Sequence, residues 1–214
     1  MLLLVFKLVI AYLLGSIVGS LVLGRLHGVD IRKQGSGNAG GTNALRTRGW
    51  RFALGVVVID IGKGALAAWI GLLPFGSSIA AETLYMHALT CALCATIGHV
   101  WPLYFGFAGG KGVATVAGAF LVLLPLAVAP LLLLWLLVIG FSGYVGLASI
   151  SIAIVLPLVG WWLAPAAQRS DMLLFAVSIG ALLLFTHRAN LQRLLAGTEN
   201  RFERARLLTR LRRD

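Results

Sequence analysis

Long apolar runs alternate with short polar stretches along the chain, and no strand-like alternation of apolar and polar residues spans it. A helix needs about 20 apolar residues to cross the bilayer core, and only helices and closed barrels satisfy their backbone groups in lipid. The pattern therefore predicts an all-α polytopic membrane protein. Seven apolar segments can be marked, at 2–24, 52–73, 79–97, 113–124, 127–139, 145–163 and 172–186.

The fourth and fifth segments leave two interpretations open. Pro125 and Pro130 lie between and within them, and proline removes a backbone donor and clashes with the preceding turn. The region could be one long kinked helix or two short helices joined by a tight turn. The segment at 2–24 is too long for a signal peptide and is followed by further spans, so we interpret it as the first crossing.

Basic residues decide between these topologies, because Lys and Arg collect in cytoplasmic loops. One cluster follows the first segment and comprises Arg25, Arg32, Lys33, Arg46, Arg48 and Arg51. A second cluster follows the last segment and comprises Arg188, Arg193, Arg201, Arg204, Arg206, Arg210, Arg212 and Arg213. Both clusters face the cytoplasm only if the prolines separate two short helices. We therefore predict seven transmembrane helices, two of them short, with the N-terminus outside and the C-terminus inside.

Composition agrees with this class. The 214 residues are 59% apolar and 12% charged, against about 25% charged in soluble domains, and we expect one domain over residues 1–214. In such a protein the net charge of +11 reports orientation and does not indicate nucleic-acid binding. Cys91 and Cys94 lie in an apolar run without a second Cys or His cluster, so they are interpreted as buried thiols.

The first polar stretch, "GSGNAGGTNALRTRG", contains far more glycine than a connecting loop needs. Glycine lets backbone N–H groups approach a ligand, and successive N–H groups in such turns bind anions. The positive-inside rule accounts for Arg48 and Arg51, whereas Arg46 offers a bidentate fork for an anion. The stretch therefore predicts an anion site built from Gly35, Ser36, Gly37, Asn38, Gly40, Thr42, Asn43 and Arg46.

A second stretch, "GHVWPLYFGFAGGKGVAT", places Gly109, Gly110, Lys111 and Gly112 before an apolar helix that begins near residue 113. Its chemistry is that of a phosphate loop at a helix N-terminus. The GxxxxGK[ST] spacing fails, so it is not a P-loop. Lys111 could also be an interfacial lysine that extends its ammonium toward water, but the three glycines around it favour a functional role.

Two further stretches lie on the predicted cytoplasmic side. In "THRANLQRLLAGTENRF", His187, Asn190 and Arg193 recur every third residue and share a helical face. Imidazole, amide and guanidinium groups suit a phosphate-bearing substrate, and His187 could transfer a proton. The stretch "FSGYVGLAS" is weak alone, because small residues are common where membrane helices touch. With the two glycine-rich stretches, these four loops are predicted to form one site.

Charges within a span and missing motifs narrow the chemistry. Asp60 and Lys63 are spaced i,i+3 within the second segment, either as functional groups or as a mutual ion pair between helices. None of the four histidines is followed five positions later by aspartate, and no GxSxG motif occurs, so a soluble-type acyltransferase dyad and a serine acyl-enzyme are not expected. Few acidic residues lie near the loops, and we expect no metal and no cofactor.

The blocks "GSGNAGGTN", "GHVWPLYFGFAGGKGVAT" and "HRANLQRLLAGTE" resemble the signatures of the bacterial membrane-integral glycerol-3-phosphate acyltransferases of the PlsY type, and "DIGKG" and "YVGLAS" also match. The resemblance covers the whole chain. Gly41 and Gly146 depart from the more common Ala and Ser, which leaves Ser149 as the better hydroxyl candidate. The resemblance implies seven helices and a cytoplasmic site that transfers an acyl group from acyl phosphate to the 1-hydroxyl of glycerol 3-phosphate, an early step of phospholipid synthesis.

The resemblance also assigns expected roles. Ser36, Asn38, Arg46 and Lys111 would hold phosphate and stabilise the leaving group, while His187, Asn190 and Arg193 would bind glycerol 3-phosphate. The predicted catalytic residues are Ser36, Arg46, Lys111, His187 and Asn190. The remaining predicted substrate-binding residues are Gly35, Gly37, Gly40, Thr42, Asn43, Gly109, Gly110, Gly112, Ser149 and Glu199. Membrane lipid surrounds the protein, which is expected to be a monomer in the bacterial inner membrane.

Two other classes remain as alternatives. A transporter for a small phosphorylated anion would suit short helices and basic loops, but it should also show an internal repeat and polar residues across the depth of the bilayer, and neither is found. A structural membrane subunit would leave the glycine-rich blocks unexplained.

Overall fold

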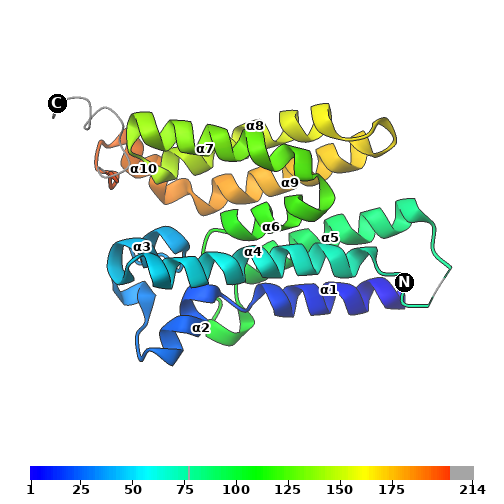
Figure 1. Ribbon diagram of the computed structural model, residues 1–214, viewed down its shortest axis with the longest axis horizontal. Coiled ribbons are helices and arrows are strands. Elements are labelled where there is room, and N and C mark those ends of the chain that lie inside the picture. Colours follow the sequence, from blue (N-terminus) through cyan, green and yellow to red (C-terminus); the bar gives the residue numbers. More distant parts are fainter. Residues whose placement is uncertain (77, 203–214) are drawn as a thin grey trace. The chain divides into compact units, whose positions relative to one another are not determined.

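The computed structural model describes residues 1–76 and 78–202, and the regular elements within them are all helices (Figure 1). The all-α prediction is confirmed. The chain forms two compact units, Met1–Leu123 and the residues from Leu124 onward. Five arginines of the predicted basic tail lie outside the described residues, namely Arg204, Arg206, Arg210, Arg212 and Arg213.

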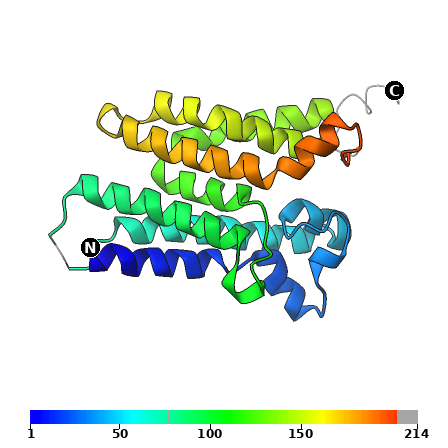
Figure 2. The ribbon, with the colours of Figure 1, turned by 180° about the vertical axis from the view of Figure 1, so that it is seen from behind.

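The first unit is a bundle in which α4 is central. Its α-helices are α1 (Leu2–Gly15), α2 (Gly19–Leu26), α3 (Gly41–Arg48), α4 (Trp50–Leu72), α5 (Ala81–Val100) and α6 (Val113–Leu123). Short 3-10 turns at Ile31–Lys33 and Leu103–Phe105 lie in the polar loops. Helix α4 packs against α1, α5 and α6, and α1 packs against α5, as both ribbon views show (Figures 1 and 2).

The second unit has α8 at its centre. Its α-helices are α7 (Val128–Ser142), α8 (Val145–Leu163), α9 (Arg169–Thr186) and α10 (Arg188–Leu195), with 3-10 turns at Pro125–Ala127 and Ala166–Gln168. Helix α8 packs against α7 and α9, and α10 contacts both α8 and α9. Leu132, Leu133 and Leu136 on α7 are each more than half exposed, as expected for side chains that face lipid.

Five helical stretches are long and apolar enough to cross a bilayer: Trp50–Leu72, Ala81–Phe105, Pro125–Ser142, Val145–Leu163 and Ala166–Thr186. The pair α1 and α2 qualifies as a sixth if it forms one bent span. Helix α6 has 11 residues and is short, as predicted. The prediction that the segment at 127–139 is also short is wrong. Helix α7 continues to Ser142 and follows directly on the turn at Pro125–Ala127, and together they are long enough to cross a bilayer. Pro130 does not interrupt it, since proline is tolerated in a first helical turn.

The first apolar segment is not the single continuous helix that its composition predicts. Helices α1 and α2 are bent by 51° at a break between Gly15 and Gly19. The backbone groups released there are paired by side chains: Lys63 Nζ donates to the carbonyl of Ile17 (2.9 Å), and the N–H of Gly19 donates to Asp60 Oδ1 (3.1 Å). Non-helical backbone within a membrane protein needs partners supplied by the protein, and the charged pair on α4 supplies two of them.

Glycines bring the helices of the first unit into close contact. A Cβ atom placed on Gly64 of α4 would overlap the carbonyl oxygen of Thr115 on α6, and one placed on Gly118 of α6 would overlap that of Ile61 on α4. Small residues at facing positions allow backbones to approach closely, which is how membrane helices gain packing energy in the absence of a hydrophobic driving force. This contact ties α6 to α4 directly behind the loop that precedes α6.

Candidate active site

The first glycine-rich loop is held by one buried amide. Asn43, which is 1% exposed, accepts the backbone N–H of Ser36 through Oδ1 (3.0 Å) and donates through Nδ2 to the carbonyls of Ile31 (3.1 Å) and Gln34 (2.9 Å). Gly35 and Gly37 flank Ser36 with φ of +57° and +74°, a region that side chains disfavour. The loop is therefore a fixed turn, and the Asn43 side chain is engaged within it.

This loop leads into the N-terminus of α3. Gly40 caps the helix, and a Cβ atom there would lie 2.7 Å from Nδ2 of Asn38, so the Asn38 amide lies directly over the helix start. The first N–H groups of a helix lack partners within the helix and favour negative charge. Ser36 and Gly37 are exposed, whereas Asn38 and Thr42 are half-buried. The turn thus combines backbone donors, a hydroxyl and an amide at one surface position.

The second glycine-rich loop folds back on the end of α5. The N–H of Gly109 donates to the carbonyl of Val100, and that of Gly110 donates to the carbonyl of His99, both at 3.1 Å. Gly112 then takes φ of +92°, and α6 begins at the next residue. Lys111, which is half-buried, therefore projects from a segment anchored on both sides, immediately before a helix N-terminus.

The two loops meet within the first unit. The Arg32 guanidinium donates through Nη1 to the carbonyls of Phe105 (2.9 Å) and Ala108 (3.1 Å), and it forms an ion pair with Asp30 at 2.9 Å. The hydrogen bonds from Arg32 lower the pKa of the Asp30 carboxyl, which keeps the pair charged. Ala39 O lies 3.1 Å from the position of a Cβ on Gly110, so the backbones of the two loops touch.

In the second unit, His187 lies at the junction of α9 and α10 and is 3% exposed. Its Nδ1 is 2.8 Å from the carbonyl oxygen of Leu183. A carbonyl can only accept, so Nδ1 carries the hydrogen and, in the neutral ring, Nε2 is the basic nitrogen. The backbone thus selects the tautomer in which Nε2 can accept a proton.

Glu199 clamps two of the predicted binding residues. Its Oε1 accepts from Asn190 Nδ2 (2.6 Å), and its Oε2 accepts from Arg193 Nε (2.7 Å). The Glu199 side chain is only 5% exposed. A Cβ atom on Gly146 would lie 2.7 Å from Asn190 Nδ2 and 3.0 Å from Glu199 Oε1, so the start of α8 packs directly on this clamp. The i,i+3 spacing of Asn190 and Arg193 predicted a shared face, and Glu199 is what fixes it.

Ser149 is placed differently from the other candidates. Its hydroxyl donates to the carbonyl of Val145 (3.1 Å) and accepts from Trp135 Nε1 (3.4 Å), and the residue is 4% exposed. These bonds join α7 and α8. We infer that Ser149 supports helix packing, and its predicted contact with substrate stays a prediction.

The comparisons with known proteins agree with this chemistry. The family model described as glycerol-3-phosphate acyltransferase matches residues 5–197. Glycerol-3-phosphate acyltransferases from Syntrophomonas wolfei and Aquifex aeolicus are 44% and 39% identical to the chain; the first alignment covers 90% of this chain and 93% of the relative, the second 92% and 98%. The chain belongs to the glycerol-3-phosphate acyltransferase family.

Solved structures give the same result for the fold. The crystal structure of PlsY, an integral membrane glycerol 3-phosphate acyltransferase, in its glycerol 3-phosphate form, matches with a TM-score of 0.83 and 38% identity over 93% of this chain and 95% of that one. The lysophosphatidic acid form matches with a TM-score of 0.79 and 37% identity, covering 92% of this chain and 94% of that one. The chain is therefore an integral membrane protein of this acyltransferase family.

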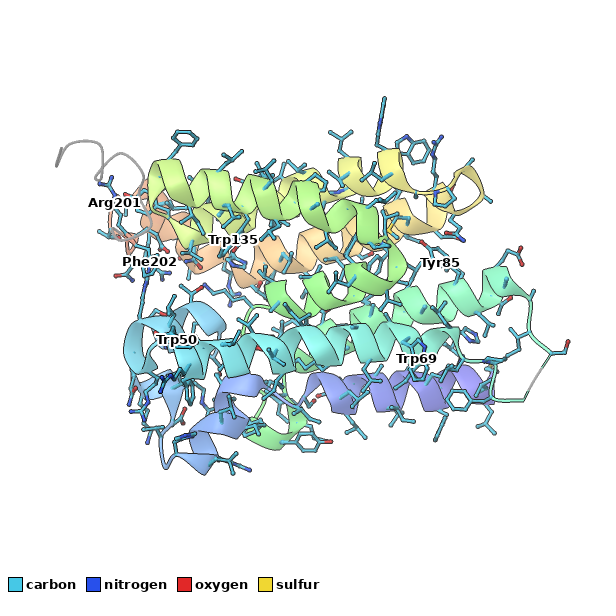
Figure 3. The ribbon with its side chains drawn as sticks, in the orientation of Figure 1. Trp50, Trp69, Tyr85, Trp135, Arg201 and Phe202 are labelled. Atoms are coloured by element: carbon cyan, nitrogen blue, oxygen red, sulfur yellow. The ribbon has the colours of Figure 1, made fainter. Side chains whose placement is uncertain are left out.

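The sequence did not predict one contact of the second unit, that between Tyr144 and Arg201. Arg201 Nε donates to the Tyr144 hydroxyl (2.7 Å), with the guanidinium 4.9 Å from the ring centroid, and the N–H of Phe202 donates to the carbonyl of Gly143 (2.8 Å). Figure 3 shows Arg201 and Phe202 beside the end of α7. The segment after α10 is thereby held against the turn before α8. The partners are 57 positions apart, so no local pattern could reveal the contact.

No group of three His, Cys, Asp or Glu side chains in residues 1–76 and 78–202 is arranged to hold a metal ion. The ion pair of Asp60 and Lys63 that their spacing allowed is present at 2.8 Å.

Proposed function

We propose that this protein transfers the acyl group of an acyl phosphate to the 1-hydroxyl of glycerol 3-phosphate, giving lysophosphatidate and inorganic phosphate. The observation that carries the proposal is family membership over residues 5–197, combined with two glycine-rich turns that each precede a helix. Both substrates bear phosphate, so the reaction needs more than one anion site. Fixed backbone N–H groups, Ser36, Asn38, Arg46 and Lys111 suit the acyl phosphate, and Asn190 and Arg193 suit glycerol 3-phosphate.

The proposed reaction is a direct displacement. The 1-hydroxyl oxygen attacks the acyl carbon, the bond from that carbon to the phosphate oxygen breaks, and inorganic phosphate leaves. The hydroxyl proton passes to His187 Nε2 or to the departing phosphate. Because an acyl phosphate has a good leaving group, positioning and charge stabilisation supply most of the rate. No metal, cofactor or acyl-enzyme is part of this proposal.

One assay tests the donor and the reaction class together. Purified protein, supplied with labelled glycerol 3-phosphate in the presence of a chelator, should form lysophosphatidate and an equal amount of inorganic phosphate from acyl phosphate. Acyl-CoA should not replace the donor. Transfer from acyl-CoA alone would overturn the proposed donor. Accumulation of unmodified glycerol 3-phosphate inside vesicles, without lysophosphatidate, would instead indicate the transporter.

We further propose a single domain, a monomer and seven crossings in the bacterial inner membrane, with the N-terminus outside and the polar loops in the cytoplasm. The support is the positive charge of the loop at residues 25–51. In a variant that lacks Cys91 and Cys94, a cysteine introduced by Trp50→Cys, at a 64% exposed position, should react with an impermeant maleimide in inside-out vesicles only. Reaction in intact spheroplasts would show the opposite orientation.

A further inference from the structure

A buried polar cluster contacts the second glycine-rich loop. It is separate from the residues proposed to touch substrate. It consists of Asp60 and Lys63 on α4 and His99 near the end of α5, which are 1%, 6% and 2% exposed. Buried charge inside a membrane protein is costly and marks a functional position by default. Support of the break between α1 and α2 accounts for Asp60 and Lys63, but it does not account for the histidine.

The contacts of Lys63 determine which ring nitrogen of His99 carries the hydrogen. Lys63 Nζ is 2.9 Å from the carbonyl oxygen of Ile17, 2.8 Å from Asp60 Oδ1 and 2.7 Å from His99 Nδ1. An ammonium group has three hydrogens and no acceptor, so each hydrogen has one partner here. His99 Nδ1 also lies 3.4 Å from Asp60 Oδ1, but the ammonium hydrogen at the shorter distance of 2.7 Å makes this nitrogen the acceptor. In the neutral ring the hydrogen then resides on Nε2. Because Asp60 Oδ1 also accepts from the N–H of Gly19 at 3.1 Å, the carboxylate is held in place as well.

The other side of the His99 ring supports the loop that carries Lys111. A Cβ atom on Gly110 would overlap His99 Nε2 and lie 3.0 Å from Cε1. The carbonyl of the same histidine accepts the N–H of Gly110. Gly110 is therefore seated on both the ring and the backbone of His99, one residue before Lys111.

We propose that His99, held as the Nε2–H tautomer by Lys63 and Asp60, is a positioning residue for the loop at 109–112. The ring of His99 fixes the position of Gly110. The position of Gly110 in turn fixes the direction of the Lys111 side chain and of the first N–H groups of α6. This inference rests on the proposed phosphate-binding role of that loop. The cluster acts through the loop and does not touch the substrate.

The chain contains a chemically matched control. Lys7 Nζ donates to the carbonyl of Gly71 (2.7 Å) and lies 3.4 Å from His87 Nδ1, so it repeats the lysine–carbonyl–histidine arrangement. Lys7 is 0% and His87 is 9% exposed. His87 precedes His99 by 12 positions on α5, or about 18 Å at 1.5 Å per residue. Loss of this second pair should lower thermal stability without a specific effect on catalysis.

Two substitutions at one position separate positioning from simple burial. In His99→Asn the amide can replace Nδ1 as the acceptor for Lys63, whereas in His99→Gln it can replace Nε2–H below Gly110. We expect His99→Gln to retain kcat within about threefold and His99→Asn to lose about tenfold or more, since misplacement by 1 Å can cost about 10²-fold. Lys63→Met should resemble His99→Asn, and Lys7→Met should retain kcat. Equal kcat in the Gln and Asn variants, or Asn above Gln, would overturn the proposal.

A spectroscopic readout keeps the test independent of activity. In protein labelled with ¹⁵N-histidine, the His99 signals, assigned by their loss in His99→Gln, should report a protonated Nε2 and an unprotonated Nδ1. A protonated Nδ1 would overturn the proposal even if Lys63→Met failed to fold. Wild-type protein that shows the expected tautomer but no acyl transfer would instead contradict the proposed function, so the two failures are distinguishable.

Discussion

Replacement of Lys111 with alanine is expected to lower kcat by about 10²–10³-fold, the cost of removing one preorganised donor from a developing negative charge. Lys111 lies between Gly110, which is bonded to the end of α5, and Gly112, which directly precedes α6. Its backbone is therefore held before substrate binds, and its ammonium group adds a full charge to the partial charge of the helix N-terminus. Charge on the departing phosphate grows during the reaction, so the main loss should be in kcat.

Lys33→Ala provides the control for this change. Lys33 is an exposed basic residue in the same unit, and its replacement alters the net charge equally but should change kcat by less than about twofold, as expected for a surface charge. Initial rates at saturating donor and acceptor, with thermal unfolding of both variants in the same detergent, give the comparison. A Lys111→Ala enzyme that is folded and retains kcat within tenfold would contradict the phosphate role of this residue.

The second large effect is expected for Glu199→Ala, mainly as a higher KM for glycerol 3-phosphate. Glu199 directs Asn190 and Arg193 through bonds of 2.6 Å and 2.7 Å, and without it both side chains lose their fixed orientation. Hydrogen bonds to charged groups contribute about 1.5–3 kcal/mol, so the KM should rise by about 10–100-fold. The increase should occur although a negative charge is removed, which would by itself favour an anionic substrate.

Glu199→Gln refines the test. Its amide oxygen can still accept from Asn190, but its amide nitrogen cannot accept from Arg193, so its KM should lie between those of the wild type and the alanine variant. Glu82→Ala, at an exposed position in the first turn of α5, should leave the KM unchanged. A KM for glycerol 3-phosphate in Glu199→Ala equal to or below the wild-type value would show that the clamp does not orient the binding groups.

The helices could be predicted from hydropathy because each long apolar run has one stable state in lipid. Each of the seven predicted segments contains helix in the structure, although five helical stretches, or six with the bent pair, are long and apolar enough to cross a bilayer. The break in the first of these segments could not be predicted, because no residue between Gly15 and Gly19 by itself excludes a helix. The break depends on contacts with another helix. Those contacts come from Lys63 and Asp60 on α4, more than 40 positions away.

The residue types of the candidate site could be predicted from the sequence, but the arrangement of their side chains could be predicted only in part. Glycine content pointed to both loops, and the i,i+3 spacing of Asn190 and Arg193 placed them on one face. Asn43, in contrast, was predicted to bind substrate because an amide in a glycine-rich loop is a good donor. The structure shows that this amide bonds to three backbone groups of its own loop, a pairing that depends on how the chain turns at Gly35 and Gly37, and its contact with substrate stays a prediction.

The sequence by itself determined the helical class, the family and the identity of the polar loops, because these depend on composition and short motifs. The tertiary structure alone decided which polar side chains contact one another. Asp60 and Lys63 could be paired from their spacing, but His99 joins them across 36 positions, and Arg32 reaches Phe105 across 73. Such partners are chosen by the packing of helices against one another, since a buried polar group must find whichever donor or acceptor the fold brings within reach.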